Sequence, residues 1–245
     1  MRLIYFYHLS AKAKIILTLF CTLFLIGSSV VYVQAEHRLK PTFEVKTDQK
    51  VLALTFDISW GTNTPTPVLD ILKKHNVRAT FFLSGPWVKK YPSIPQRIAA
   101  DGHEIGSHGN EHINLSTVSK EKIREEIMLA HQSIQAVTGH TPNLIRTPNG
   151  DYNNQVISTA NECGYRVIQW GTDSLDWKNP GVDAIVNRVL KRAHPGDIIL
   201  MHASDTCKQT VDALPRIIEG LREQGYQFVT VSELLQLEQN QINSR

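Results

Sequence analysis

The sequence is poor in cysteine. It has three in 245 residues, and Cys21 lies in an apolar N-terminal stretch, which leaves Cys163 and Cys207 for the rest of the chain. One pair cannot make a disulfide framework, so the folded part must be stable through its own hydrophobic core. The sequence leaves open whether Cys163 and Cys207 pair.

The folded part also lacks an excess of either charge. Of 26 basic residues, Arg2, Lys12 and Lys14 precede the first acidic residue, Glu36, and the remaining 23 balance 23 acidic residues. A nucleic-acid-binding domain is expected to carry a basic excess. The balance therefore argues against nucleic acid as a partner. A hydrophobic content of 42% is that of an ordinary globular protein, which excludes global disorder.

Residues 15–35 contain no charged side chain, and they are nearly long enough to span a bilayer, which takes about 20 apolar residues. Lys12 and Lys14 precede them, which favours a cytoplasmic N-terminus for residues 1–14. Two interpretations stay open. The segment is an uncleaved transmembrane anchor, which its length favours, or a secretory signal with Val33-Gln34-Ala35 as its small-residue cleavage site. Both place the rest of the chain outside the cytoplasm, with the N-terminal segment in contact with the membrane.

The remaining chain is predicted to be a linker at 36–45, one domain at 46–237 and a polar tail at 238–245. Within the domain, short β-branched and aromatic runs alternate with amphipathic stretches, which indicates parallel strands joined by helices. Seven strands are predicted: Val51–Phe56, Ala79–Leu83, His103–Ser107, Asn143–Arg146, Arg166–Gln169, Asp197–His202 and Gln227–Val231.

The clearest predicted helix covers residues 120–137, with Ser119 as its N-cap and Gly139 and Pro142 after its end. A second is expected at residues 210–224. The fold class is therefore α/β. A distorted seven-stranded (β/α) barrel is the simplest closure, and an open doubly wound sheet is the alternative.

Polar residues collect where the predicted strands end. In a parallel barrel these ends lie on one face, where barrel enzymes build their active sites. One shared site is therefore predicted. The residues are Asp57, His108, Arg146, Asp173, Asp176 and His202.

The residue types at these positions suggest metal-assisted hydrolysis. His108 and His112 are four apart, a spacing that on a helical turn lets both rings bind one metal ion, although an exposed turn fits as well. Asp57 suits a general base, or a helix cap. His202 suits a general acid, because histidine titrates near neutral pH, or a neutral core residue.

Three further side chains are candidates for positioning or substrate contact. Arg146 is expected to fix a carboxylate, either Asp57 or Asp176, through a two-pronged contact, or else to form a surface ion pair. Trp60 and Trp177 are candidates for stacking on a sugar ring, with a place in the core as the alternative. The position of Trp60 in a Ser-Trp-Gly loop favours the groove.

These pieces in this order resemble the polysaccharide deacetylases with NodB homology, also called carbohydrate esterase family four, over about Val51 to Leu235. The run from Asp57 to Gly61 is most similar to the sporulation-associated branch called PdaB, from spore-forming bacteria. Five family motifs are matched in order: Thr55-Phe56-Asp57, Ser107-His108 through His112, Arg146 with Pro148 and Gly150, Asp176-Trp177, and Leu200-Met201-His202.

The resemblance implies a distorted seven-stranded barrel and a divalent metal, zinc or else cobalt or nickel. The implied reaction is hydrolysis of an N-acetyl group on an amino sugar of a cell-wall glycan such as peptidoglycan, outside the cell membrane, in the forespore or spore envelope. The resemblance assigns Asp57 as base, His202 as acid, Arg146 as the partner of Asp57 and Asp176 as the partner of His202. It assigns the metal to His108 and His112.

The sequence departs from the family pattern at two positions. Ile58 stands where the family has a metal-binding aspartate, which leaves two histidines where three protein ligands are usual. Asp57, Glu111 or a water is then expected to complete the shell. Asn149 replaces an aromatic residue and is expected to alter one wall of the substrate groove.

Two hypotheses therefore stand: an active metal-dependent deacetylase with a variant metal shell, or a weak or inactive relative that binds wall glycan or has a structural role. A hydrolase that uses no metal is a third. It leaves the two histidines unexplained.

Overall fold

The computed structural model describes the backbone of residues 10–36 and 38–243, and side chains for 10–25, 38–238 and 240. The chain divides into two compact units, Met1–Leu39 and Lys40–Arg245. In the described part of the first unit there is one helix, α1 (Ala11–Glu36). Among the described residues no helix is both long and apolar enough to cross a membrane. The predicted transmembrane segment at 15–35 lies within α1 and is not confirmed.

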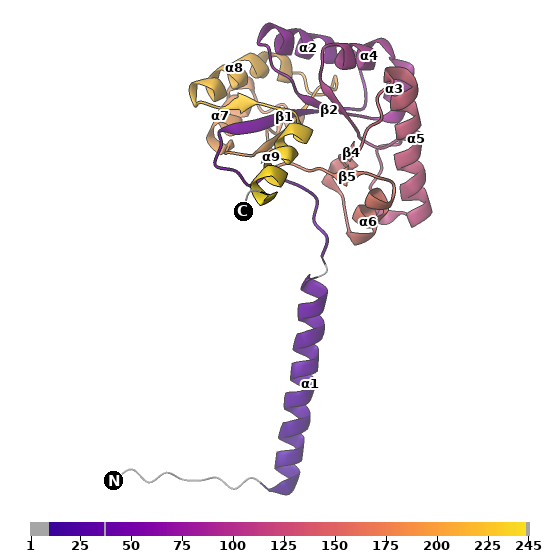
Figure 1. Cartoon of the computed structure of the whole chain (residues 1–245), viewed down its shortest axis with the longest axis vertical. Helices are drawn as coiled ribbons and strands as arrows, with labels where there is room; N and C mark the ends of the chain where they lie inside the picture. Colours follow the sequence, from indigo (N-terminus) through magenta and orange to yellow (C-terminus); the bar gives the residue numbers. More distant parts are fainter. Residues whose placement is uncertain (1–9, 37, 244–245) are drawn as a thin grey trace, which may run out of the picture. The chain divides into compact units, whose positions relative to one another are not determined.

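The second unit is built on a curled sheet whose strands are all parallel (Figure 1). Hydrogen bonds connect seven strands in the order β5-β4-β3-β2-β1-β7-β6, and β8 pairs with the first two residues of β1. The strands are β1 (Val51–Ile58), β2 (Thr80–Leu83), β3 (Glu104–Ser107), β4 (Leu144–Ile145), β5 (Arg166–Val167), β6 (Thr172–Asp173), β7 (Ile198–His202) and β8 (Gln227–Phe228).

The α/β prediction is confirmed, and the sheet is a curled, partly open barrel with β5 and β6 at the ends of the strand path. Six of the seven predicted strands contain an observed one, and the first lies within β1, which extends two residues further, to Ile58. The structure adds β6, which the prediction missed. It also shortens the last predicted strand to Gln227–Phe228, and Val231 begins a helix instead.

Helices cover the outer face of the sheet, and pack in the spatial order α6, α5, α4, α2, α8 and α7. The helix predicted at 120–137 is observed as α5, with the predicted cap: the hydroxyl of Ser119 accepts the N–H of Lys122 at 3.3 Å. The bounds of the helices are α2 (Pro65–Lys74), α3 (Gly85–Lys90), α4 (Ser93–Ala100), α5 (Lys120–Thr138), α6 (Asn154–Glu162), α7 (Val182–Arg192), α8 (Thr210–Glu223) and α9 (Val231–Asn243).

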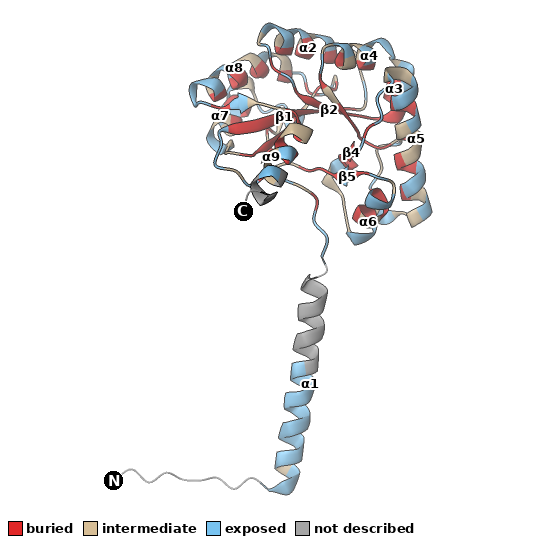
Figure 2. Cartoon of the chain, viewed as in Figure 1, coloured by how far each residue is buried: buried red, intermediate tan, exposed pale blue. Residues whose placement is uncertain are grey.

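Side chains alternate between the two faces of β1, as the pleat requires. Leu52, Leu54, Phe56 and Ile58 join the apolar layer between the sheet and the helices. Val51 and Ala53 belong to a second cluster, and Asp57 lines a cavity, so the odd-numbered positions face the other side. Figure 2 shows β1 and β2 buried throughout.

Two segments predicted to lie outside the domain continue its structure. The predicted linker 36–45 contributes Thr42, which pairs with Ile168 beyond β5, and Glu44, which pairs with Asp197 before β7. Val45 is buried in the second apolar cluster. The predicted polar tail at 238–245 is helical through Asn243, as the last part of α9, whose buried leucines Leu234 and Leu235 anchor it.

Candidate active site

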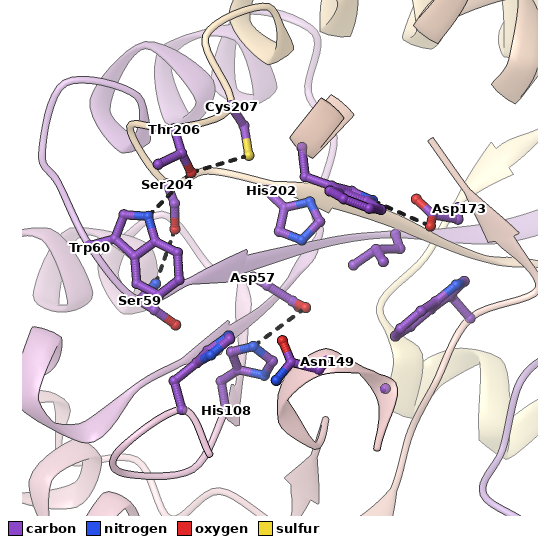
Figure 3. A pocket seen from close by; sticks show the side chains of 15 residues that line it. Asp57, Ser59, Trp60, His108, Asn149, Asp173, His202, Ser204, Thr206 and Cys207 are labelled. Carbon is purple, nitrogen blue, oxygen red and sulfur yellow. Dashed lines mark hydrogen bonds and ion pairs between the residues drawn. The ribbon is translucent and has the colours of Figure 1, made fainter. Parts of the chain in front are cut away.

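A cavity of about 420 Å³ opens at the carboxyl ends of the strands (Figure 3). It brings together most of the predicted site residues. Its lining includes Asp57, Trp60, His108, His112, Asn149, Asp173, Trp177 and His202. Arg146 and Asp176 do not line it. Arg146 is hydrogen-bonded to Asp57 from behind, and Asp176 to His202.

Asp57, near the end of β1, is held by a buried arginine. Arg146 is fully buried, and its Nη1 donates to Asp57 Oδ1 at 2.9 Å. The same nitrogen donates to Thr55 Oγ1 at 2.8 Å, and Nη2 donates to the carbonyl of Gln169 at 3.0 Å. Of the two carboxylates predicted as partners of Arg146, the structure selects Asp57, through one hydrogen bond.

The charge of Arg146 keeps Asp57 ionised. Burial alone would raise the pKa of this carboxyl. The positive charge and hydrogen bond of Arg146, with contributions from His108 and His202 in their protonated forms, outweigh burial and lower the pKa below its ordinary value. A buried carboxylate with its second oxygen toward the cavity can accept a proton, which is what a general base requires.

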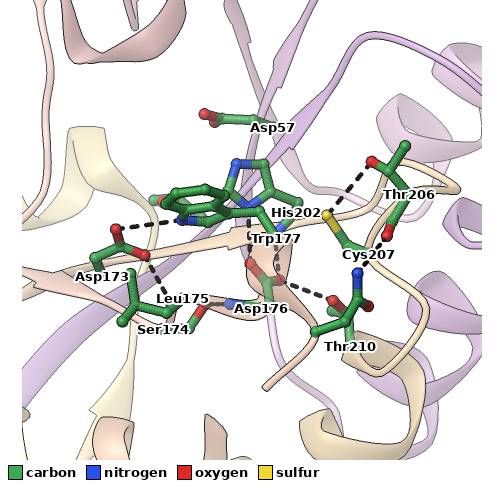
Figure 4. A network of polar contacts seen from close by, with 12 residues as sticks. Asp57, Asp173, Ser174, Leu175, Asp176, Trp177, His202, Thr206, Cys207 and Thr210 are labelled. Atoms are coloured by element: carbon green, nitrogen blue, oxygen red, sulfur yellow. Dashed lines mark hydrogen bonds and ion pairs between the residues drawn. The ribbon is translucent and has the colours of Figure 1, made fainter. Parts of the chain in front are cut away.

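His202 ends β7 and is held by a second buried carboxylate (Figure 4). Asp176 Oδ1 accepts His202 Nδ1–H at 2.7 Å, and Oδ2 accepts the backbone N–H of His202 at 2.8 Å and the Thr210 hydroxyl at 2.7 Å. The Nδ1 contact leaves Nε2 as the nitrogen available to the cavity. Figure 4 shows the ring between Asp176 and Asp57.

The pKa of His202 is raised above its ordinary value. Burial lowers it, but the hydrogen bond and charge of Asp176, with the charges of Asp57 and Asp173, raise it by more. The ring therefore keeps its proton to a higher pH than a free histidine, which suits a general acid. The cavity thus holds a carboxylate whose pKa is lowered and an imidazole whose pKa is raised.

The two histidines of the predicted metal pair lie together on the loop after β3. Their ring centroids are 5.1 Å apart. His108 is buried and His112 is half-buried with a left-handed backbone, φ +53°. Burial lowers the pKa of His108 to about 4, and it also lowers the pKa of His112. Both rings are therefore neutral at neutral pH, the form that binds metals.

The surroundings of His108 fit a cation. Its Nδ1 lies 2.8 Å from the carbonyl of Arg146, and since a carbonyl can only accept, the proton is on Nδ1 and Nε2 carries a lone pair. That Nε2 lies 3.7 Å from Asp57 Oδ2. Two electron-rich atoms face each other there without a proton between them. A divalent cation would complement both, and a carbonyl on the far nitrogen is the usual support for a metal-binding histidine.

The shell of this pair remains short of protein ligands. Ile58 is fully buried in the layer between sheet and helices, so it offers nothing to the cavity. Glu111 is exposed, and its carboxylate lies 3.5 Å from Lys122 Nζ on α5. Among the described residues, only Asp176, His202 and Cys207 offer three metal-binding atoms within 4.8 Å of one another. Of the side chains considered as a third metal ligand, only Asp57 is therefore left beside His108 and His112.

Glu126 on α5 holds the loop of the pair and was missed in the sequence. It is fully buried, and its Oε2 accepts the backbone N–H groups of Asn110 at 3.1 Å and Glu111 at 2.7 Å, two of the three residues between the two histidines. A signal existed, because Glu126 lies three residues after Ile123 and four before Ala130, on the apolar stripe of the helix.

The loop that carries Trp60 is also held by residues that the sequence did not single out. Asp205 accepts the backbone N–H groups of Thr62, Asn63 and Thr64, at 2.8–3.1 Å. Trp60 itself is 43% exposed, and its Nε1 donates to Thr206 Oγ1 at 3.2 Å. Its ring meets His112 edge to face, with centroids 5.1 Å apart. No local pattern predicts such contacts, because about 140 residues separate the partners.

The other predicted groove residues lie at the rim of the cavity. Trp177 is 48% exposed, and its Nε1 contacts Asp173 Oδ2 at 3.5 Å. Asn149 has a left-handed backbone, φ +58°, and its side-chain amide donates to Asn114 at 2.7 Å. Trp170, absent from the sequence prediction, also lines the cavity. Cys163 and Cys207 are both free thiols, so they do not pair.

Comparison with known proteins identifies the class to which this fold and site belong. The sequence model described as polysaccharide deacetylase matches residues 44–168. The chain belongs to this family, whose enzymes hydrolyse N-acetyl amide bonds of glycans.

Individual relatives differ in substrate and in activity. A peptidoglycan-N-acetylglucosamine deacetylase of Bacillus cereus is 41% identical over 197 residues, 79% of this chain and 92% of that protein. A peptidoglycan-N-acetylmuramic acid deacetylase of Bacillus subtilis is 33% identical, over 77% of this chain and 73% of that protein.

A solved structure of a carbohydrate esterase family four pseudoenzyme from Bacillus anthracis is 35% identical, with a TM-score of 0.76 over 80% of this chain and 69% of that one. A variant of that pseudoenzyme with restored enzymatic activity matches equally well, at 36% identity and a TM-score of 0.76 over 80% of this chain and 71% of that one.

Proposed function

We propose that this protein is a hydrolase that removes N-acetyl groups from amino sugars of a cell-wall glycan, most specifically peptidoglycan. One observation carries the proposal: Asp57, paired with Arg146, and His202, paired with Asp176, meet in one cavity. The two pairs push the proton affinities of base and acid in opposite directions, which is the arrangement that acid–base hydrolysis requires. The named activities of the relatives supply the substrate class.

The residues divide the reaction between them. Asp57 accepts a proton from the attacking water, and Arg146 holds its carboxylate in place and ionised. His202 donates a proton to the departing amine nitrogen, and Asp176 fixes the ring so that Nε2 faces the substrate. Acetate and a free amino sugar are the products. Trp60 and Trp177 flank the cavity as faces on which sugar rings stack.

His108 and His112 would hold the divalent metal of this reaction, with zinc as the first candidate. When bound, the ion would polarise the acetyl carbonyl and stabilise the negative charge that develops on its oxygen. Its support comes from the lone pair of His108 Nε2, which faces Asp57 across 3.7 Å. With Ile58 in the apolar layer, the site is expected to bind the ion more weakly than one with three protein ligands.

Metal-stripped and zinc-loaded protein are the two samples that test this function. Acetate release from peptidoglycan is expected only after loading, and His108→Ala should remove it. Arg78→Ala serves as a matched control, since that residue pairs with Glu233 away from the site. Equal acetate release from stripped and loaded protein would contradict the metal-dependent reaction and support a hydrolase that uses no metal.

A second candidate function is glycan binding without turnover. The buried Ile58 and the fold shared with a pseudoenzyme favour it. Retention of peptidoglycan in a pull-down, with no acetate released at any metal concentration, would establish it.

We propose in addition that the domain acts outside the cytoplasm. The uncharged stretch at 15–35 after Lys12 and Lys14 supports this location, with the N-terminal segment contacting the membrane as an anchor or acting as a signal. The similarity of Asp57–Gly61 to the PdaB branch supports a role in the forespore or spore envelope. Protease applied to intact cells should cleave an externally placed domain, and complete protection would contradict the location.

A further inference from the structure

Beside the cavity lies a second set of metal-binding atoms, separate from the histidine pair. The deacetylation scheme uses two of its members, Asp176 and His202, but gives no role to Cys207. Asp176, His202 and Cys207 each place one such atom within 4.8 Å of the others. They come from three different elements: a 3-10 turn (Asp176–Lys178), the end of β7, and the loop before α8. Figure 3 shows Asp57 between His108 and two members of this set, His202 and Cys207.

We infer that Asp176, His202 and Cys207 form a second cation site, specific for thiophilic divalent ions such as Zn²⁺, Co²⁺ or Cd²⁺. The thiol of Cys207 supplies the specificity, because soft thiolate ligands select these ions over Mg²⁺ and Ca²⁺. When bound to the ion, the Asp176 carboxylate and the Cys207 thiolate would together carry the two negative charges that balance a divalent ion.

The hydrogen bonds of Asp176 allow such an ion to enter. Oδ2 holds the His202 backbone N–H and the Thr210 hydroxyl, whereas Oδ1 holds only the proton on His202 Nδ1, at 2.7 Å. Replacing that single proton by a metal ion leaves both Oδ2 contacts intact. Asp176 would therefore bind the ion through Oδ1, and His202 through Nδ1.

Cys207 is placed to complete the set. The residue is 1% exposed, yet it lines the cavity, and its thiol has a contact of 3.8 Å with the Thr206 hydroxyl. Ligands of one tetrahedral zinc ion lie about 3.5 Å apart, so side-chain shifts of about 1 Å suffice. Solvent in the cavity would supply the fourth ligand.

Binding of an ion to these ligands releases or moves protons. The thiol proton goes to solvent when the metal–sulfur bond forms. The Nδ1 proton of a neutral His202 ring moves to Nε2, whereas a ring that already carries both protons releases one to solvent. Burial raises the pKa of the Cys207 thiol to about 12, so metal binding is expected to weaken as the pH falls.

The consequence for activity rests on the proposed function, although the binding itself does not. An ion on Nδ1 separates His202 from Asp176, the contact that keeps the ring protonated. Excess thiophilic cation should therefore inhibit a deacetylase that the same ion activates at low concentration through His108 and His112.

Cobalt is the probe that separates the two sites, because only a cobalt–thiolate bond gives intense charge-transfer absorption in the near ultraviolet. The full chain, kept reduced without a thiol reagent, is titrated with Co²⁺. The band is expected in the wild type and in His108→Ala, and is expected to vanish in Cys207→Ser. Cys163→Ser is the matched control and should keep it, since Cys163 lies away from the cavity beside Arg124.

No band in the wild type, or an unchanged band in Cys207→Ser, would overturn the inference. Should Cys207→Ser fail to fold by circular dichroism, His202→Ala gives a second test that keeps the thiol. Its half-saturating Co²⁺ concentration should rise at least about tenfold, since even outer-shell changes cost 10–100-fold in metal affinity. An unchanged half-saturating concentration would mean that the Cys207 thiol binds the ion without His202, which would also overturn the inference. Acetate release does not enter this test, so its outcome is separate from that of the proposed function.

Discussion

Removal of the Arg146 side chain should be among the most destabilising changes in this domain, and its cost can be traced to one partner. Arg146 is fully buried and donates to Asp57, Thr55 and the carbonyl of Gln169. Arg146→Met keeps an apolar stem against the ring of Phe82, over which the guanidinium lies at 4.3 Å. It leaves the Asp57 carboxylate buried without its arginine partner, which costs about 3–5 kcal/mol.

A double-mutant cycle isolates this partner. In Asp57→Asn/Arg146→Met no buried charge remains at the pair, so the double variant should be more stable than Arg146→Met alone. The lost contacts to Thr55 and Gln169 are the same in both and cancel. Urea unfolding followed by circular dichroism gives the four free energies. If the two single costs add to within about 0.5 kcal/mol, the residues are uncoupled and the assigned ion pair is refuted.

The pH dependence supplies an independent check. Because the folded-state pKa of Asp57 is lowered, the pair contributes its full stability above the unfolded pKa, about 3.9, and loses it as pH falls through the folded value. Arg146→Met lacks this contribution. The gap in unfolding free energy between wild type and Arg146→Met should therefore be constant near neutrality and shrink in acid.

Three further changes test the site. Asp176→Asn removes the charge that raises the pKa of His202, so the basic limb of the pH profile of kcat/KM should move to lower pH. The weakened general acid should also lower the rate by about 10²-fold or more. A basic limb that stays at the same pH would contradict the pairing of Asp176 with His202. Glu126→Ala should weaken divalent-metal binding about 10–100-fold in calorimetry, because the histidine loop loses both hydrogen bonds to Glu126. Glu126→Gln can still accept these two hydrogen bonds and should keep most of the affinity. Equal losses in the two variants would show that the charge of Glu126, rather than its hold on the loop, matters. Trp177→Ala should raise KM for peptidoglycan up to about tenfold with little change in kcat, as expected for the loss of one stacking face, and a change confined to kcat would place this ring at the chemistry instead.

The polar site could be anticipated because its residues mark strand ends. Asp57, His108, Arg146 and His202 each end or follow a run with a clear strand pattern, and parallel strands bring such ends to one face. The sequence could not show which carboxylate Arg146 would meet. That choice depends on its buried position beside β1, which is a property of the curled sheet.

The features that could not be predicted depend either on very short segments or on contacts between residues far apart in the sequence. β6 has two residues, too few for an alternating pattern, and its pairing with β7 comes from hydrogen bonds rather than composition. The end of the last helix was predicted as a tail because residues 238–243 are polar except Ile242, although the buried leucines of that helix lie one turn earlier. Asp205 and Thr210 act on backbone and side chains far along the chain, so no local motif marks them.

The central claim is that Asp57 and His202 form a working acid–base pair for N-acetyl hydrolysis despite Ile58. Its most direct test is to incubate zinc-loaded protein with peptidoglycan and quantify both products, acetate and free amino groups on the sugars. The account predicts equal amounts of the two from the wild type and neither from Asp57→Asn, with His202→Ala slowed by about 10²-fold or more. Peptidoglycan that is bound but keeps all its acetyl groups, at every zinc concentration, would contradict the claim and leave a glycan-binding relative of the deacetylases.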